Sequence, residues 1–116
     1  MAFKQFPVIY GGGNYVPEKY ALNQNYPNPF NPTTTISFTL SAPAVVTLNI
    51  YNILGQEVAT LIDRESMEDG SQEIDFDANN LPSGVYFYHL VAQGAPDEDG
   101  KVAATFSAIK KMLLVK

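Results

Sequence analysis

The chain's 116 residues, its net charge of −5 and its lack of cysteine each exclude a class of protein. The length allows one ordinary domain, the acidic balance argues against a nucleic-acid binder, and a chain without cysteine forms neither disulfides nor thiolate metal sites. Hydrophobic residues make up 46% of the sequence, which is enough for a buried core, and no apolar run approaches the roughly 18 residues of a membrane span.

The N-terminal region differs in composition from the rest of the chain. It begins MAFKQFPVIYGGG, which lacks the continuous apolar stretch of a signal peptide, and its glycine run is a flexible break. We interpret residues 1–24 as a linker or the remnant of a preceding domain, and residues 25–116 as the folded domain. We therefore expect the chain to be the C-terminal part of a longer protein that carries any export signal elsewhere.

A proline-rich stretch opens the folded part, where residues 25–36 read NYPNPFNPTTTI. Each proline fixes φ near the polyproline value and favours extended geometry in the residue before it. The stretch is therefore predicted to be a stiff, extended entrance to the domain. Tyr26 and Phe30 are its large apolar side chains, and at least one of them should pack onto the domain body. The domain-entrance motif consists of Tyr26, Pro27, Asn28, Pro29, Phe30 and Pro32.

Short segments of alternating apolar and polar residues follow, which is typical of strands with one buried face. In residues 35–40, for example, Ile36, Phe38 and Leu40 share one face. No segment keeps a helical period over the length of a helix. The sequence therefore predicts an all-β fold, an antiparallel sandwich of about seven strands. Strands are expected at 35–40, 45–51, 57–62, 72–76 and 85–92, with closing strands at 102–107 and 108–115.

Turn residues and charged runs separate these strands. Gly55 is expected to take a positive φ in a turn at residues 52–56. A denser turn is expected at 77–84. The polar segment 63–69 and the acidic segment 94–101 are expected to be exposed loops.

Residues 81–88, LPSGVYFY, indicate the type of sandwich. In immunoglobulin-like sandwiches a corner tyrosine bonds back to the backbone, and the residue two positions later lies in the core. With Gly84 ending the turn, Tyr86 takes the corner position, and Tyr88 and Leu90 follow it into the core. A slip of one residue would exchange the two faces of the strand, so the alternative is burial of Val85, Phe87 and Val91.

No constellation of residues indicates catalysis. His89 is the single histidine, without a nucleophile partner or a second metal ligand, and we interpret it as an ordinary strand residue. The acids at 97–99 precede Gly100 as in a calcium loop, but they lack the alternating spacing of EF-hand ligands. The acids Glu65, Glu68 and Asp69 are interpreted as part of a solvated loop. We expect no enzyme activity, no cofactor, no metal site and no small-molecule substrate.

The aromatic run at 86–88 does not form a single sugar-binding platform, because alternation sends neighbouring side chains to opposite faces of a strand.

The last residues of the chain are basic and apolar. Lys110, Lys111 and Lys116 flank an apolar stretch at 112–115. As structure, this pattern is typical of a terminal strand whose charges discourage edge-to-edge aggregation. In functional terms, the basic residues would form a positively charged recognition signal that a partner protein binds. Composition alone leaves both interpretations open.

Four blocks of the sequence, taken in order, resemble the type A C-terminal sorting domains of the type IX (Por) secretion system of Bacteroidetes. They are YPNPFNPTTTI at 26–36, LNIYNILGQEV at 48–58, LPSGVYFY at 81–88 and KKM at 110–112. The resemblance runs from about residue 21 to the last residue and leaves the first 20 residues uncovered.

The resemblance implies an immunoglobulin-like sandwich at the C-terminus of an exported cargo protein that is secreted or held at the cell surface. Such a domain is recognised by an outer-membrane translocon and usually removed by a sortase-like peptidase, and its cargo is commonly attached to surface lipopolysaccharide. Here the translocon would contact Lys110, Lys111 and Lys116. The acidic segment 94–101 is longer than the family's usual hairpin, which puts the usual exposure of the terminal strands in question.

Cleavage is expected before Tyr26 and not within the prolines, because φ-locked residues fit a protease groove poorly. The alternative function is a structural spacer or a carbohydrate-binding module that stays on a secreted multidomain hydrolase.

Overall fold

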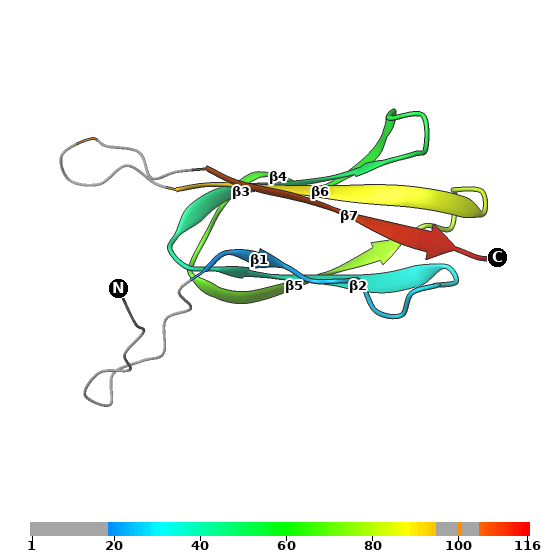
Figure 1. The fold of residues 1–116 in the computed structure, drawn as a ribbon, viewed down its shortest axis with the longest axis horizontal. Helices are drawn as coiled ribbons and strands as arrows, with labels where there is room; N and C mark the ends of the chain where they lie inside the picture. Colours follow the sequence, from blue (N-terminus) through cyan, green and yellow to red (C-terminus); the bar gives the residue numbers. More distant parts are fainter. Residues whose placement is uncertain (1–18, 95–99, 101–104) are drawn as a thin grey trace, which may run out of the picture.

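The computed structural model describes residues 19–94, 100 and 105–116, which form seven strands in two facing sheets (Figure 1). One sheet has the order β1-β2-β5 and the other the order β4-β3-β6-β7, and all neighbours are antiparallel. The expected all-β sandwich is confirmed. The strands are β1 (Ala21–Leu22), β2 (Thr33–Leu40), β3 (Ala44–Tyr51), β4 (Glu57–Met67), β5 (Gly70–Asp77), β6 (Gly84–Gly94) and β7 (Thr105–Leu114).

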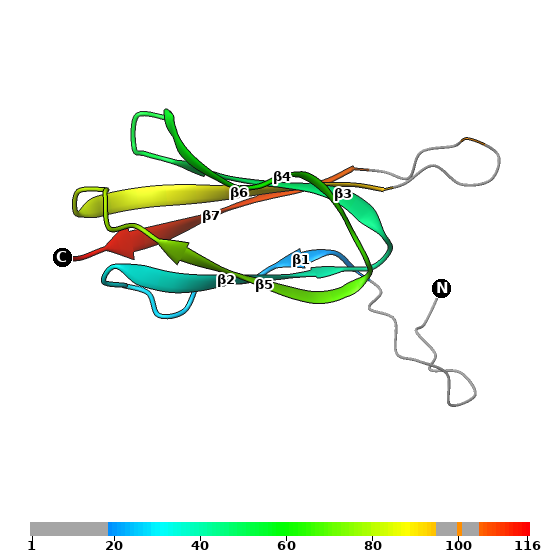
Figure 2. The ribbon, with the colours of Figure 1, turned by 180° about the vertical axis from the view of Figure 1, so that it is seen from behind.

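The core lies between the two sheets, which also face each other in the view from behind (Figure 2). Strict alternation along β2, β3 and β6 turns every second side chain inward. Burying each large side chain contributes about 1.5–3 kcal/mol of hydrophobic stabilisation, before the cost of ordering the chain. The largest fully buried side chains on these strands are Thr34, Ile36, Phe38, Leu40, Val46, Leu48, Ile50, Tyr88 and Leu90.

The strand order is that of an immunoglobulin-like sandwich with one strand transferred. In the constant-type arrangement the fourth strand joins the sheet of the first, second and fifth strands. Here β4 instead pairs with β3. The short turn at residues 52–56 explains the difference, because it joins the two strands as a hairpin and keeps them neighbours.

The favoured phase of β6 is confirmed. Tyr86, Tyr88 and Leu90 are 4%, 0% and 0% exposed, whereas their neighbours on the strand are only half-buried. The Tyr86 hydroxyl donates a hydrogen bond to the carbonyl of Pro82 at 2.7 Å, which is the backward bond of a tyrosine corner. The three aromatic residues at 86–88 therefore do not share one face.

The expectation of a loop at 63–69 was wrong, because β4 continues to Met67 and turns into β5 at Gly70. Its register against β3 shifts between Val46 and Leu48, and Arg64 lies at a φ of 52°, so the strand carries a bulge there. The charges that suggested a loop belong to an edge strand, which has no second partner strand and keeps its polar side chains in water.

Two further boundaries differ from expectation. The closing strands predicted at 102–107 and 108–115 are one continuous strand, β7, which pairs with β6 from Gln93 opposite Thr105 to Gly84 opposite Leu114. Strand β1 was not expected, and it pairs Ala21 with Thr39 of β2. Residues 1–18, 95–99 and 101–104 lie outside the described part, which includes most of the expected linker and acidic segment.

The sandwich has two distinct ends. At the entry end, Ala21 begins the first strand and β2 turns into β3. At the C-terminal end lie residues 26–32, the β3–β4 turn, the β5–β6 turn and the end of β7 (Figure 1). In the part of the chain that the structure describes, no helix is long and apolar enough to span a membrane.

Candidate functional site

The sequence blocks that carry the resemblance meet at the C-terminal end of the sandwich. The proline segment, defined as residues 26–32, forms a bridge through Phe30 to Leu114 at the end of β7. The turns at 52–56 and 81–84 close the same end on the other side of β7 and β6 (Figures 1 and 2). The fold therefore assembles one composite surface from segments that are far apart in the sequence.

The proline segment is not the extended entrance that was expected. Tyr26 and Thr35 exchange two backbone hydrogen bonds of 3.0 Å, so the segment curls and returns onto β2. Its prolines lack an N–H and cannot continue a strand ladder, and the burial of one ring holds the middle of the curl against the sandwich. That ring is Phe30, which is 2% exposed, whereas Tyr26 is 81% exposed. The expectation that at least one of the two packs onto the body is confirmed.

Backbone hydrogen bonds join the proline segment to the terminal strand. The Phe30 N–H donates to the carbonyl of Leu113, and the Val115 N–H donates to the carbonyl of Phe30, both at 2.9 Å. The Leu113 N–H donates to Oδ1 of Asn28, also at 2.9 Å. The domain-entrance motif and the end of the chain are thus one structural unit.

A buried polar network fixes the start of the proline segment. Asn25 and Thr34 are 2% and 1% exposed. Nδ2 of Asn25 donates to Oγ1 of Thr34 at 3.0 Å and to the carbonyl of Pro27 at 3.1 Å, and Oγ1 of Thr34 donates to the same carbonyl at 2.8 Å. Sequence reasoning missed both residues, although an amide and a hydroxyl flanking a proline run are a signal that such a network is needed.

Tyr88 connects the two sheets through this network. Its hydroxyl accepts a hydrogen bond from the Asn25 N–H at 2.8 Å and donates one to the carbonyl of Asn23 at 2.7 Å. Burial raises the pKa of Tyr88 to about 12, although the hydrogen bond from the Asn25 backbone lowers it. Tyr88 stands where immunoglobulin domains place an inter-sheet cysteine, and its hydroxyl ties β6 to the residues that follow β1.

The lysines predicted to contact a translocon do not form one cluster. Lys110 and Lys111 are neighbours on β7 and therefore point to opposite faces, with Lys111 the more exposed. The Lys116 N–H donates to Oγ of Ser83 at 3.0 Å, and its Nζ donates to the carbonyl of Asn79 at 2.6 Å. The last residue is thus attached to the β5–β6 turn.

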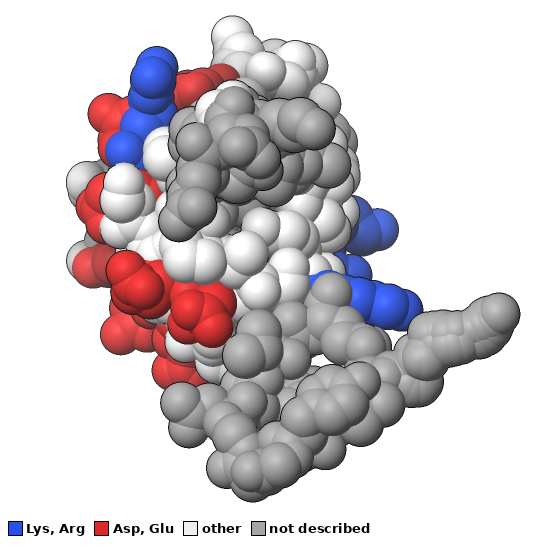
Figure 3. All heavy atoms as spheres, turned by 90° about the vertical axis from the view of Figure 1, so that its left-hand side faces the viewer, with Lys and Arg blue, Asp and Glu red and all other residues white. Residues whose placement is uncertain are grey.

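Charge is unevenly distributed over the described residues. Their acidic side chains all lie between Glu57 and Asp77, on β4, β5 and the turn between them. Lysines 110, 111 and 116 are on or beyond β7, on the opposite edge. Figure 3 shows this separation, with Asp and Glu gathered toward one side and most of the basic groups toward the other. Arg64 on β4 is the exception.

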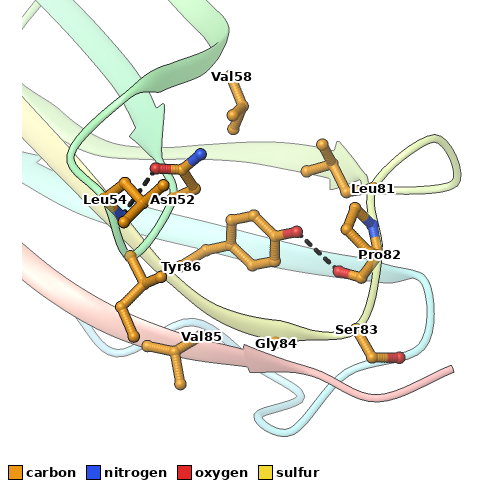
Figure 4. Close-up of a pocket in the computed structure, with 10 residues that line it drawn as sticks. Asn52, Leu54, Val58, Leu81, Pro82, Ser83, Gly84, Val85 and Tyr86 are labelled. Carbon is orange, nitrogen blue, oxygen red and sulfur yellow. Dashed lines mark hydrogen bonds between the residues drawn. The ribbon is translucent and has the colours of Figure 1, made fainter.

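A shallow apolar groove of about 260 Å³ separates the β3–β4 turn from the β5–β6 turn (Figure 4). Gly55 takes a φ of 81° in the first turn and Gly84 a φ of 154° at the end of the second. The Tyr86 ring lies between the two turns, with its hydroxyl directed at Pro82. Sequence reasoning identified these residues as structural and did not detect the groove, which exists only when the turns are brought together.

His89 lies outside this groove, on the outer face of its sheet. Its Nε2 is 2.7 Å from Oγ of Ser107, and its ring centroid is 6.4 Å from that of Tyr51. Among the described residues, no group of three or more His, Asp or Glu side chains is placed to hold a metal ion. The acids at 97–99 lie outside the described residues.

Comparison with known families agrees with the resemblance in the sequence. The model of the secretion system C-terminal sorting domain, Por_Secre_tail, matches residues 24–102, which is more than half of the chain. None of the curated proteins that were compared matches this chain. The match covers the proline segment, both turns of the groove and strand β6. The chain therefore belongs to the family of type IX (Por) secretion system C-terminal sorting domains.

Proposed function

We propose that this domain is a non-catalytic signal that directs an N-terminal cargo protein through the type IX outer-membrane translocon and marks it for cleavage and attachment to the cell surface. The observation that carries the proposal is the family match over residues 24–102. Membership in the family implies that the protein is secreted or attached at the cell surface.

The proposed translocon surface includes Lys110, Lys111 and Lys116. Removing residues 110–116 is a poor test of their role, because Met112 and Leu114 are 1% and 0% exposed and the truncated domain would lose part of its core. Charge removal is the sharper test. Replacing the three lysines with glutamine keeps the length of each side chain close to that of lysine and leaves the buried residues in place.

The proposal is tested by export of a fluorescent protein that carries a signal peptide and ends in this chain, in a host with a type IX system. The wild-type fusion is expected outside the cell, and a fusion without the chain in the periplasm. The triple glutamine variant is expected to be exported several-fold less, because charged groups guide association. Periplasmic retention of the wild-type fusion would contradict the proposed function itself.

The position of cleavage is a second part of the proposal. Leu22 and Asn25 are 7% and 2% exposed, and Ala21 is paired with β2. A peptidase needs an extended, accessible backbone, so we place the cut before Ala21. This agrees with cleavage before Tyr26. If the mature surface protein retained the whole domain, the alternative of a structural spacer or a carbohydrate-binding module would be favoured.

A further inference from the structure

A hydrogen-bonded turn at the C-terminal end of the sandwich exposes two large aliphatic side chains to water. Ile53 and Leu54 are 72% and 79% exposed. Oδ1 of Asn52 accepts hydrogen bonds from the N–H groups of Leu54 at 2.9 Å and Gln56 at 3.0 Å. The Gly55 N–H donates to the carbonyl of Asn52 at 3.0 Å. The turn is thus shaped by its polar residues, and folding gains little from the two exposed side chains.

These side chains form one wall of the apolar groove. Figure 4 shows Leu54 and Val58 on the side of the β3–β4 turn and Leu81 and Pro82 on the side of the β5–β6 turn, with Tyr86 between them. None of the lining residues carries a charge, and the complete lining is Asn52, Ile53, Leu54, Val58, Leu81, Pro82, Ser83, Gly84, Val85 and Tyr86.

The size of the groove limits what it can bind. Ten residues line it, whereas a stable interface between two protein faces takes roughly 20–30 residues from each side. Its volume of about 260 Å³ is below the roughly 300–1,000 Å³ of small-molecule pockets. A second copy of the domain and a cofactor are therefore both poor fits. A few side chains on a protruding loop fit the available space.

The charges around the groove define the chemistry of that loop. The described acids lie on β4, β5 and the turn between them, and lysines 110, 111 and 116 are on or beyond β7, so neither group lines the groove. An occupant with a charged tip would lose part of its hydration, and none of the ten lining residues would offer it a counter-charge. An uncharged apolar tip would instead bury its own surface together with that of Ile53 and Leu54.

We infer that the groove between the β3–β4 and β5–β6 turns is a docking site for an uncharged, apolar loop of a protein of the secretion machinery. This inference rests on the proposed function and names a surface whose lining includes none of the three lysines, although Lys116 is bonded to Ser83 at its edge. The groove lies at the opposite end of the sandwich from Ala21, where the chain enters (Figure 1). A cargo protein joined ahead of β1 therefore leaves this end open.

The test compares export of the fluorescent fusion for two double variants and one single control variant. Ile53→Ser with Leu54→Ser removes the apolar wall and is expected to lower the exported fraction about tenfold. Ile53→Val with Leu54→Met keeps the wall apolar and is expected to be exported as the wild type is. The matched control is Tyr26→Ser, at a side chain that is 81% exposed and belongs neither to the groove lining nor to the proposed lysine surface, and normal export is expected.

Folding and function are separated by the urea midpoint of each purified domain. The double serine substitution at positions 53 and 54 changes exposed side chains only, so its midpoint is expected to equal that of the wild type. Export of that variant at the wild-type level would overturn the inference, as would an equal loss in the Tyr26 control. If the wild-type fusion itself stayed in the periplasm, the proposed function would fail, and this outcome is distinct from failure of the groove alone.

Discussion

At the scale of single residues, Tyr88 has the most demanding position in the domain. It is fully buried, and its hydroxyl both accepts and donates a hydrogen bond to the backbone at Asn25 and Asn23. A buried hydroxyl between two backbone groups stabilises the fold mainly because either group, left unpaired, would be costly. This one side chain therefore fixes the distance between β6 and the chain that follows β1.

Tyr88→Phe is expected to lower the free energy of unfolding by about 1–3 kcal/mol, because the ring still fills its space while the Asn25 N–H and the Asn23 carbonyl lose their partner. Urea denaturation measures the change. Tyr26→Phe is the control, since the Tyr26 side chain is 81% exposed, and it is expected to change stability by less than about 0.5 kcal/mol. Equal effects of the two substitutions would contradict this role for Tyr88.

Alkaline pH should destabilise the domain through the same residue. The pKa of Tyr88 is about 12 in the folded domain, against an ordinary value of 10.0. Because folding favours the neutral phenol, its contribution is complete below about pH 10 and is lost as the pH rises through about 12. Between about pH 10 and 12, the free energy of unfolding of the wild type should therefore fall by up to about 2–3 kcal/mol more than that of Tyr88→Phe. Parallel stability curves for the two proteins would refute the prediction.

At the scale of elements, the proline segment acts as a clamp rather than an entrance. It is bonded to β2 through Tyr26 and to β7 through Phe30, so it holds the edges of the two sheets together. Strand β7 forms its ladder with β6 alone. The proline segment covers the last residues of its free edge, which would otherwise present unpaired backbone groups at the C-terminal end.

Phe30→Ala should destabilise the domain by about 3–5 kcal/mol, because it empties a buried aromatic site next to the ring of Phe76. Tyr26→Ala in the same segment is a matched control. Its ring is 81% exposed, and the expected change is below about 0.5 kcal/mol. Thermal and urea unfolding of both variants give the comparison. Similar losses in the two would mean that the segment is held by its backbone bonds alone.

At the scale of the whole molecule, the fold separates two ends and two edges. The chain enters at one end, and the family's sequence blocks gather at the other. Acidic side chains occupy the edge of β4 and β5, while lysines occupy the edge of β7 (Figure 3). Such a molecule can join a cargo at one end while its opposite end and its basic edge stay available to partners.

Mass spectrometry of the exported fusion checks the proposed cut. The released cargo is expected to end before Ala21, because Leu22 and Asn25 are buried in the folded domain and hidden from a peptidase. Replacing residues 19–20 with Gly-Gly should leave the cut on the N-terminal side of β1. A cargo that ends within residues 26–32 would show that the domain unfolds before it is cleaved.

The sequence by itself determined the strands and the faces they present. Alternation in β2, β3 and β6 has a period of two, and a wrong phase would have placed Tyr88 and Leu90 in water. Local turn chemistry at Gly55 and the corner at Tyr86 were also readable, because each depends on residues within a few positions. The four sequence blocks indicated the family for the same reason, because each block is a local motif.

Only the tertiary structure decided how those blocks meet. The curl of the proline segment depends on bonds from Phe30 to Leu113, and the tie from Tyr88 to Asn25 spans 63 positions. The charges of residues 63–67 suggested a loop, because a short stretch of sequence gives no sign that these residues pair with β3. The groove needs two turns from different hairpins. Contacts between distant residues carry no periodic signal, so they are settled only when the sheets pack together.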